Sequence, residues 1–210
     1  MRFEPNLFNS AVNFNINPRL KEMNFDKSVE DLIYQLKADK DILGRRWAMG
    51  ELMRLMEESS DKTKILSAVR DSAEKDTSWL IRREAIANLH SIFVPKTPRG
   101  APEPTAVLDE TTAQMLLKAV KDEQSLIRAD AIALLGATKD AKYTDLYLAA
   151  LNDKSYGVID SAAISLGFTK SPKAFDALIK LTKTSSWRGR IQIAGLYGLA
   201  VLGDKRAPVK

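Results

Sequence analysis

Apolar and polar residues follow one another along most of this chain with the spacing of amphipathic helices, and one short pattern marks where successive helices meet. An aspartate is followed six residues later by an arginine, and then by an alanine-rich apolar run. The last three units begin at residues 122, 153 and 184, a period of 31 residues. A period of this length predicts a stack of similar two-helix units rather than one globular core.

The pattern occurs five times, and two of its copies are incomplete. They are Asp39 with Arg45, Asp76 with Arg82, Asp122 with Arg128, Asp153 with Ile159, and Thr184 with Arg190. The aspartates end the turn inside each unit and the arginines begin the helix that follows. We therefore expect the charged members to form an inter-repeat ladder of charge-assisted hydrogen bonds between adjacent units. The breaks at Ile159 and Thr184 predict a looser joint between units four and five.

Helical spacing predicts about five helix pairs. Ser28 can cap the first helix, with Asp31 three residues later, and Arg45–Met56 is the second helix of that unit. The remaining units are expected to start at Lys62 and Asp109, then at Lys142 and Pro172, and to end at Phe93, Leu135, Phe168 and about Val201. The expected fold is an all-α, right-handed superhelix occupying residues 28–210.

Three segments do not follow the repeat. Residues 1–27, rich in asparagine, are expected to be an extended lead-in whose Phe3, Phe8, Phe14 and Phe25 cover the first helix pair. Residues 94–108, with four prolines, are expected to be an inserted surface loop. Residues 202–207 resemble the entry to a sixth unit, which suggests a piece of a longer protein or an end that packs against something.

Composition narrows the function classes. The chain of 210 residues contains no cysteine, which excludes disulfides and thiolate metal sites. No apolar run is long enough to span a membrane, and the first residues lack a signal-peptide pattern, so a cytoplasmic location is only the default. The net charge is +5, and the basic residues of the C-terminal half do not form the dense stripe that phosphate binding requires.

The residues that follow each arginine position should face the concave side of the superhelix. The candidate partner-binding residues there are Arg46, Trp47, Arg83, Glu84, Asp130, Asp160 and Gln192. This surface is expected to grade from basic and aromatic at the front to acidic in the middle. Such a gradient favours a protein or peptide partner over a phosphate backbone.

The repeat resembles the HEAT repeat. The best match is the run from Leu116 to Gly136, Leu-Leu-Lys-Ala-Val-Lys-Asp-Glu-Gln-Ser-Leu-Ile-Arg-Ala-Asp-Ala-Ile-Ala-Leu-Leu-Gly, in its apolar positions, turn aspartate, arginine and Ala-Leu-Gly ending. The resemblance covers about residues 28–203. It implies an α-solenoid with a concave binding face, and it implies no particular chemistry.

A second resemblance concerns the front of the chain. Leu20-Lys21-Glu22-Met23-Asn24-Phe25-Asp26-Lys27-Ser28, with Leu32-Ile33-Tyr34-Gln35-Leu36 and Asp39-Lys40-Asp41-Ile42-Leu43-Gly44-Arg45-Arg46-Trp47-Ala48, is similar to the C-terminal helical region of bacterial M1-family aminopeptidases. It implies an accessory domain that follows the catalytic domain of a zinc peptidase. The family's His-Glu-x-x-His zinc motif is impossible here, because His90 is the only histidine.

Catalytic alternatives find little support. His90 falls at a repeat core position and has no triad partners, and glycines stand singly rather than in a phosphate-binding loop. HEAT-like DNA alkylation-repair glycosylases contain a stretch comparable to Trp79-Leu80-Ile81-Arg82-Arg83. However, Trp47, Trp79 and Trp187 do not stand at the same position relative to the arginines of their units, so their side chains need not converge on one pocket. No metal, cofactor or catalytic residue is expected. A freestanding adaptor-type scaffold, adaptin-like, remains an alternative to the peptidase accessory domain.

Overall fold

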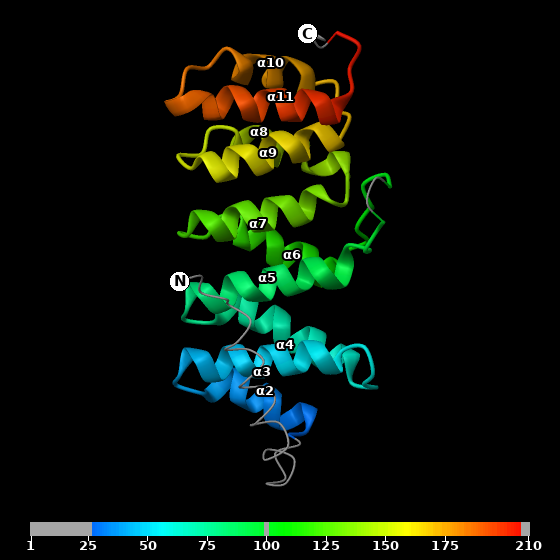
Figure 1. Cartoon of the computed structure of the whole chain (residues 1–210), viewed down its shortest axis with the longest axis vertical. Coiled ribbons are helices and arrows are strands. Elements are labelled where there is room, and N and C mark those ends of the chain that lie inside the picture. The colour runs from blue at the N-terminus through cyan, green and yellow to red at the C-terminus, as the bar shows by residue number, and fades with distance from the viewer. Residues whose placement is uncertain (1–26, 99–100, 207–210) are drawn as a thin grey trace, which may run out of the picture.

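The computed structural model describes residues 27–98 and 101–206, and within these ranges every regular element is a helix. The helices stack in one column, with α3, α5, α7, α9 and α11 side by side on one face and their partners behind them (Figure 1). The prediction of an α-solenoid with about five helix pairs is confirmed. The expected lead-in lies almost wholly outside the described residues.

Each pair consists of two antiparallel helices joined by a short turn. The pairs are α2 (Val29–Ala38) with α3 (Ile42–Leu55), α4 (Lys62–Lys75) with α5 (Trp79–Phe93), α6 (Glu110–Ala119) with α7 (Ser125–Gly136), α8 (Thr144–Ala150) with α9 (Tyr156–Phe168), and α10 (Ala174–Thr182) with α11 (Arg190–Leu202). Short 3-10 helices, η1 (Ala141–Tyr143) and η2 (Trp187–Gly189), precede α8 and α11. α3 begins at Ile42, three residues before the predicted start at Arg45, because Asp41 caps the helix there.

The first two helices, α2 and α3, begin after residues whose side chains cap them. The Ser28 hydroxyl accepts a hydrogen bond from the Asp31 amide at 3.1 Å, and the Asp31 carboxylate accepts one from the Ser28 amide at 3.2 Å. This capping box satisfies two amides that the first turn of α2 leaves free. Asp41 caps α3 in the same manner by accepting from the Leu43 amide.

The segment between α5 and α6 is not helical where the structure describes it, at residues 94–98 and 101–109. It packs on the end of α7: the Ala106 amide donates to the Ala137 carbonyl at 2.9 Å, and Lys139 Nζ donates to the Glu103 carbonyl at 2.6 Å. Ala106 is buried by this contact. The described part of this segment is therefore attached to the solenoid, although its status as an insertion stays a prediction.

Glycines bring the later helices unusually close. A Cβ placed on Gly167 in α9 would lie 2.5 Å from the Gly198 carbonyl oxygen in α11, and one on Gly198 would lie 2.7 Å from the Ala163 carbonyl oxygen. Real side chains do not tolerate such distances, so only glycine permits this approach. The joint between units four and five lacks an aspartate–arginine pair at the ladder positions, but Arg190 donates to Asp160 across it and the helix backbones pack closely. This packing argues against the looser joint that the sequence suggested.

Within the described ranges, no helix combines the length and the apolar character that crossing a bilayer would require.

Candidate functional site: the groove on the α3, α5 and α7 face

Three arginine–aspartate pairs with the same geometry link adjacent units of the stack. Arg45 donates through Nε and Nη2 to the carboxylate of Asp76 at 2.9 and 3.0 Å. Arg82 makes the same pair of bonds to Asp122, and Arg128 makes it to Asp153. Each arginine lies in the second helix of one unit and each aspartate in the turn of the next. These pairs fix the rotation between units.

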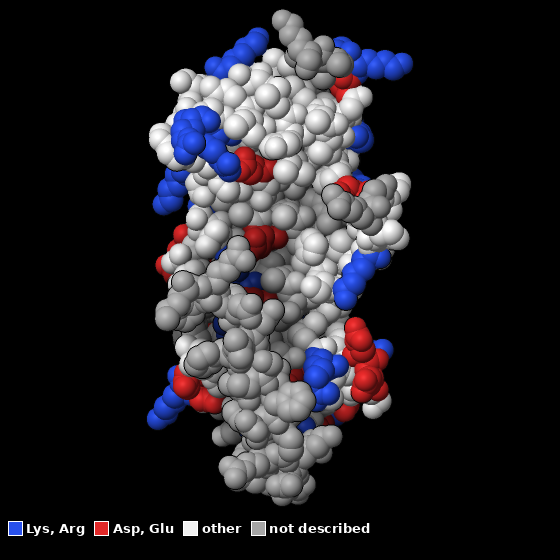
Figure 2. All heavy atoms as spheres, in the orientation of Figure 1, with Lys and Arg blue, Asp and Glu red and all other residues white. Residues whose placement is uncertain are grey.

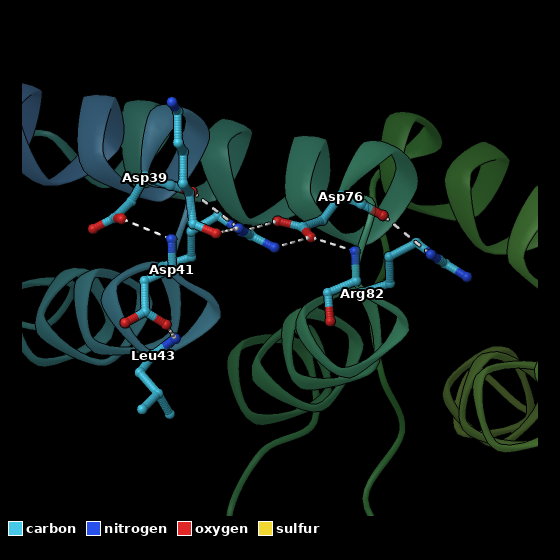
Figure 3. Close-up of polar contacts among 8 residues, drawn as sticks. Asp39, Asp41, Leu43, Asp76 and Arg82 are labelled. Carbon is cyan, nitrogen blue, oxygen red and sulfur yellow. Dashed lines mark hydrogen bonds and ion pairs between the residues drawn. The ribbon is translucent and has the colours of Figure 1, made fainter.

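Each arginine also closes the turn of its own unit. Nη1 donates to the main-chain carbonyl six residues earlier, from Arg45 to Asp39, from Arg82 to Asp76, and from Arg128 to Asp122. The aspartate carboxylates in turn accept from the amide two residues later, as Asp76 does from Ser78 at 2.7 Å. Figure 3 shows this arrangement at the first turns, with the Asp76 carboxylate between the two units.

Two predicted ladder residues do not form such a pair. Asp39 has no unit before it among the described residues, and its carboxylate accepts from the Asp41 amide and from Gln35 instead. Those hydrogen bonds, chiefly the one from the Asp41 amide, lower the pKa of Asp39. Arg190 donates to Asp160 of the preceding unit. Asp39 and Arg190, at the two ends of the expected ladder, therefore do not form its arginine–aspartate pairs.

A groove lies across the face formed by α3, α5 and α7, with a volume of about 730 Å³. We call it the α3–α7 groove. Its lining residues are Ile42, Leu43 and Arg46 from α3, Leu80, Ile81, Arg83, Glu84, Ile86, Ala87 and His90 from α5, and Asp130 and Ala133 from α7. Most of the lining is aliphatic. A cavity of this size and character suits a peptide or a protein side-chain cluster.

The charged residues of the groove neutralise one another across units. Arg46 Nε lies 2.8 Å from Glu84 Oε2, and Arg83 Nε lies 2.8 Å from Asp130 Oδ2. Where this face is not grey, Figure 2 shows acidic and basic side chains lying together in the hollowed middle of the stack. Each arginine is therefore compensated by an acid of the following unit, and the predicted gradient from basic to acidic stays a prediction.

Exposed leucines recur at one position of the repeat. Two residues before each ladder arginine stand Leu43, Leu80 and Leu126, whose exposed fractions are 66%, 49% and 44%. Leu43 projects away from the helix in Figure 3, and Leu43 and Leu80 line the groove. Single exposed leucines are common on protein surfaces, but a set repeated in register beside a groove is typical of an interaction surface.

The structure brings together only part of the predicted concave-face set. Arg46, Arg83, Glu84 and Asp130 line the α3–α7 groove. Asp160 lines a smaller neighbouring cavity of about 250 Å³, while Trp47 and Gln192 line neither of the two. Gln192 accepts a hydrogen bond from Ser186 within its own unit. The apolar lining was not predicted, although a leucine stands two residues before Arg45, Arg82 and Arg128.

His90 requires a further correction. It was placed at a repeat core position, but its side chain is exposed and lies at the boundary of both cavities. In the part of the chain that the structure describes, no three His, Cys, Asp or Glu side chains gather in a way that suits a metal ion.

The pKa of Asp160, an acid that lines the smaller cavity, is shifted by its surroundings. Burial raises the pKa of the Asp160 carboxyl group, and the guanidinium of Arg190 opposes the rise without cancelling it. Asp153, seven residues earlier, shows the reverse, since its hydrogen bonds from Arg128 lower its pKa. The pKa values of the two acids are therefore shifted in opposite directions.

The repeats are similar to a family already known from other proteins. The model of the family described as HEAT repeats matches residues 113–197, which extend from α6 into α11. No curated protein matches the chain. The match and the all-helical stack support a HEAT-repeat protein, and its fold is an α-solenoid of about five helix pairs.

Proposed function

We propose that this chain is a non-catalytic interaction module that binds a protein or peptide in the α3–α7 groove. The observation that carries the proposal is the combination of an aliphatic lining with charges that are already paired. Full burial of an exposed leucine contributes about 1.5–3 kcal/mol. Leu43 and Leu80 are 66% and 49% exposed, so a partner that covers them would gain the corresponding part of that energy. HEAT repeats generally act as protein-interaction scaffolds, which agrees with this role.

The same observation disfavours a nucleic-acid partner. Phosphate binding needs several uncompensated lysines or arginines in a row. The arginines of the groove, Arg46 and Arg83, each face a carboxylate at 2.8 Å. The carboxylates of Glu84 and Asp130 would therefore repel a polyanion that approaches these arginines.

For the setting of the module, we propose the C-terminal accessory region of an M1-like zinc aminopeptidase. The support is the resemblance at residues 20–48, part of which lies in α2 and α3. Within it, Leu32, Leu36 and Ala48 are buried and Arg45 forms the first inter-unit pair, so the matching positions have structural roles. In that setting the module would dock on the catalytic domain or cover its active site.

Peptide selection tests the binding function. A phage library of random peptides, about 12 residues long, is panned against the immobilised full chain and against two Leu→Glu variants. Leu80→Glu places a charge in the groove, while Leu196→Glu changes a similarly exposed leucine of α11 that does not line it. We expect enriched peptides that bind the wild type and Leu196→Glu and lose at least tenfold affinity for Leu80→Glu. Equal binding to both variants, or no enrichment, contradicts the proposal.

The peptidase setting has its own test in the source gene. A reading frame continuous with Met1 and encoding His-Glu-x-x-His with a downstream glutamate would support it. A stop codon in frame directly upstream would contradict it without affecting the binding function.

A further inference from the structure

We propose that α11 binds a second copy of the chain, with the two α11 helices antiparallel about a two-fold axis. Helices α10 and α11 form the last layer of the stack (Figure 1). One side of α11 and the residue that ends it expose Ile193, Leu196, Ala200 and Gly203. We call these four residues the α11 face. It is separate from the α3–α7 groove, so this inference goes beyond the proposed function.

The corresponding face of an earlier helix is covered by the unit that follows. On α7, that face contains Ile132 and Gly136, both of which are buried. Ser165 of α9 covers them: its hydroxyl group donates to the Ile132 carbonyl at 3.3 Å, and a Cβ on Gly136 would lie 2.0 Å from its Oγ. The burial of this face of α7 therefore depends on the next unit.

The same relationship recurs one unit later and then stops. Gly198 of α11 covers Ala163 and Gly167 of α9. This covering residue stands 33 residues after its counterpart on α9, and the same step leads from the covered pair to Leu196 and Ala200. Ala163 is fully buried, whereas Leu196 is 53% exposed, because no helix follows α11 in the described part of the chain. The α11 face is thus a packing face without its covering helix.

Side-chain sizes along this face are self-complementary. Ile193 and Leu196 are large, and Ala200 and Gly203 are small. If two copies align antiparallel about an axis midway between Leu196 and Ala200, Leu196 of one copy faces Ala200 of the second copy. Ile193 then faces Gly203 of the second copy. A two-fold axis repeats each contact, so every large side chain meets a small residue and the helices can approach closely.

The absence of charge on this face favours a second copy as the occupant. The segment Ile191–Leu202 contains no Asp, Glu, Lys or Arg. A two-fold interface brings the same surface of both copies together, so a charged face would repel its own copy and this face does not. The nearest arginines are already compensated, since Arg190 donates to Asp160 and Arg206 donates to Asp204.

Sedimentation equilibrium of the full chain over a wide range of concentrations tests the proposal. We expect a monomer–dimer equilibrium. Leu196→Glu and Ala200→Glu each place one charge per copy beside the axis, so each should weaken the dimer at least about tenfold. Leu126→Glu is the matched control, because Leu126 of α7 is 44% exposed and lies outside the α11 face. Circular dichroism shows whether the variants keep their helices.

Cysteine variants test the antiparallel register, since the chain contains no cysteine to interfere. Leu196→Cys is mixed with an equal amount of isotope-labelled Ala200→Cys, the mixture is oxidised, and the disulfides are quantified by mass spectrometry. We expect mixed disulfides to exceed the half that random pairing gives. Predominance of the two homodisulfides would show parallel helices and overturn the proposed pairing.

Three results of sedimentation would overturn the proposal. They are a monomer at every concentration, equal weakening of the dimer by Leu126→Glu and Leu196→Glu, and species that grow beyond the dimer, which would indicate head-to-tail assembly. Peptide selection on the α3–α7 groove is independent of these results, because that groove lies in units one to three. A failure of either test therefore leaves the other conclusion standing.

Discussion

The guanidinium group of Arg128 donates to both carboxylate oxygens of Asp153, at 2.9 and 2.8 Å, and also to the Asp122 carbonyl in its own unit at 2.8 Å. One side chain therefore closes the turn of unit three and fixes the orientation of unit four. The hydrogen bonds to the Asp153 carboxylate raise the pKa of Arg128. Ile159, at the next arginine position, cannot continue the series, and glycines bring the following helices together instead.

Replacing Arg128 by alanine should destabilise the protein by about 3 kcal/mol, because the carboxylate of Asp153 and two carbonyls lose their donor in a poorly solvated place. The two side chains of the pair are only 9% and 17% exposed. Arg46→Ala is the control, since its pair with Glu84 is 64% and 31% exposed and should contribute less than about 1 kcal/mol. Urea denaturation followed by circular dichroism measures both. Similar losses for the two variants would contradict a structural role for the inter-unit pairs.

Gly167→Ala should lower stability by about 1–3 kcal/mol, although alanine is the better helix former. The added methyl group would lie 2.5 Å from the Gly198 carbonyl oxygen and force α9 and α11 apart. Gly50→Ala in α3 is the matched control, because no atom approaches its Cβ position within 4 Å. That variant should gain about 0.5–1 kcal/mol from helix propensity. Amide exchange in α11 should accelerate in Gly167→Ala alone, and unchanged exchange would show that the close approach does not stabilise this joint.

Acidification should affect Asp153 and Asp160 in opposite ways. The pKa of Asp153 is lowered by Arg128, so its contribution is complete above its ordinary pKa of 3.8 and is lost as the pH falls through its folded-state pKa. The pKa of Asp160 is raised by burial, so the folded state binds its proton more readily and gains stability as the pH falls through that value.

Asparagine substitutions separate these two contributions. Asp153→Asn should flatten the loss of stability as the pH falls below about 5, and Asp160→Asn should steepen it. The measured quantity is the free energy of unfolding at several pH values within this range. A change of slope in the same direction for both variants would contradict the assignment.

The repeat and its helix pairs were predictable, because both follow from local patterns that recur along the chain. Ser28 with Asp31 indicates a helix start, and the six-residue interval from Asp122 to Arg128 reflects the turn that Arg128 closes. The partner of each arginine was harder to specify. Asp153 lies 25 residues after Arg128, whereas Asp122 lies 40 residues after Arg82, since the chain between α5 and α6 is longer.

The charged residues that line the α3–α7 groove were predictable from the sequence, but their pairing and the exposed leucines beside them were not. Arg83 and Asp130 were expected on this face, but their direct pairing depends on the rotation between units, which no single repeat encodes. Exposure of Leu43, Leu80 and Leu126 was not predicted, because an apolar residue in a helical repeat is normally assigned to the core. Leu80 stands beside Ile81, which is fully buried, and only the packing of neighbouring units shows which of the two faces outward.

Salt dependence should distinguish a peptide-binding groove from a nucleic-acid surface. If the α3–α7 groove binds through Leu43 and Leu80, the affinity of a selected peptide should change less than about twofold between 50 and 200 mM salt, since the Debye length matters little for apolar contacts. A protein that contacts several phosphates would lose about 10³–10⁵-fold over the same range. Titration of a fluorescent peptide and of a fluorescent DNA duplex, both followed by anisotropy, makes the comparison. Tight duplex binding with a steep salt slope would replace the proposed function by the repair-glycosylase alternative, whereas weak duplex binding at low salt would eliminate that alternative.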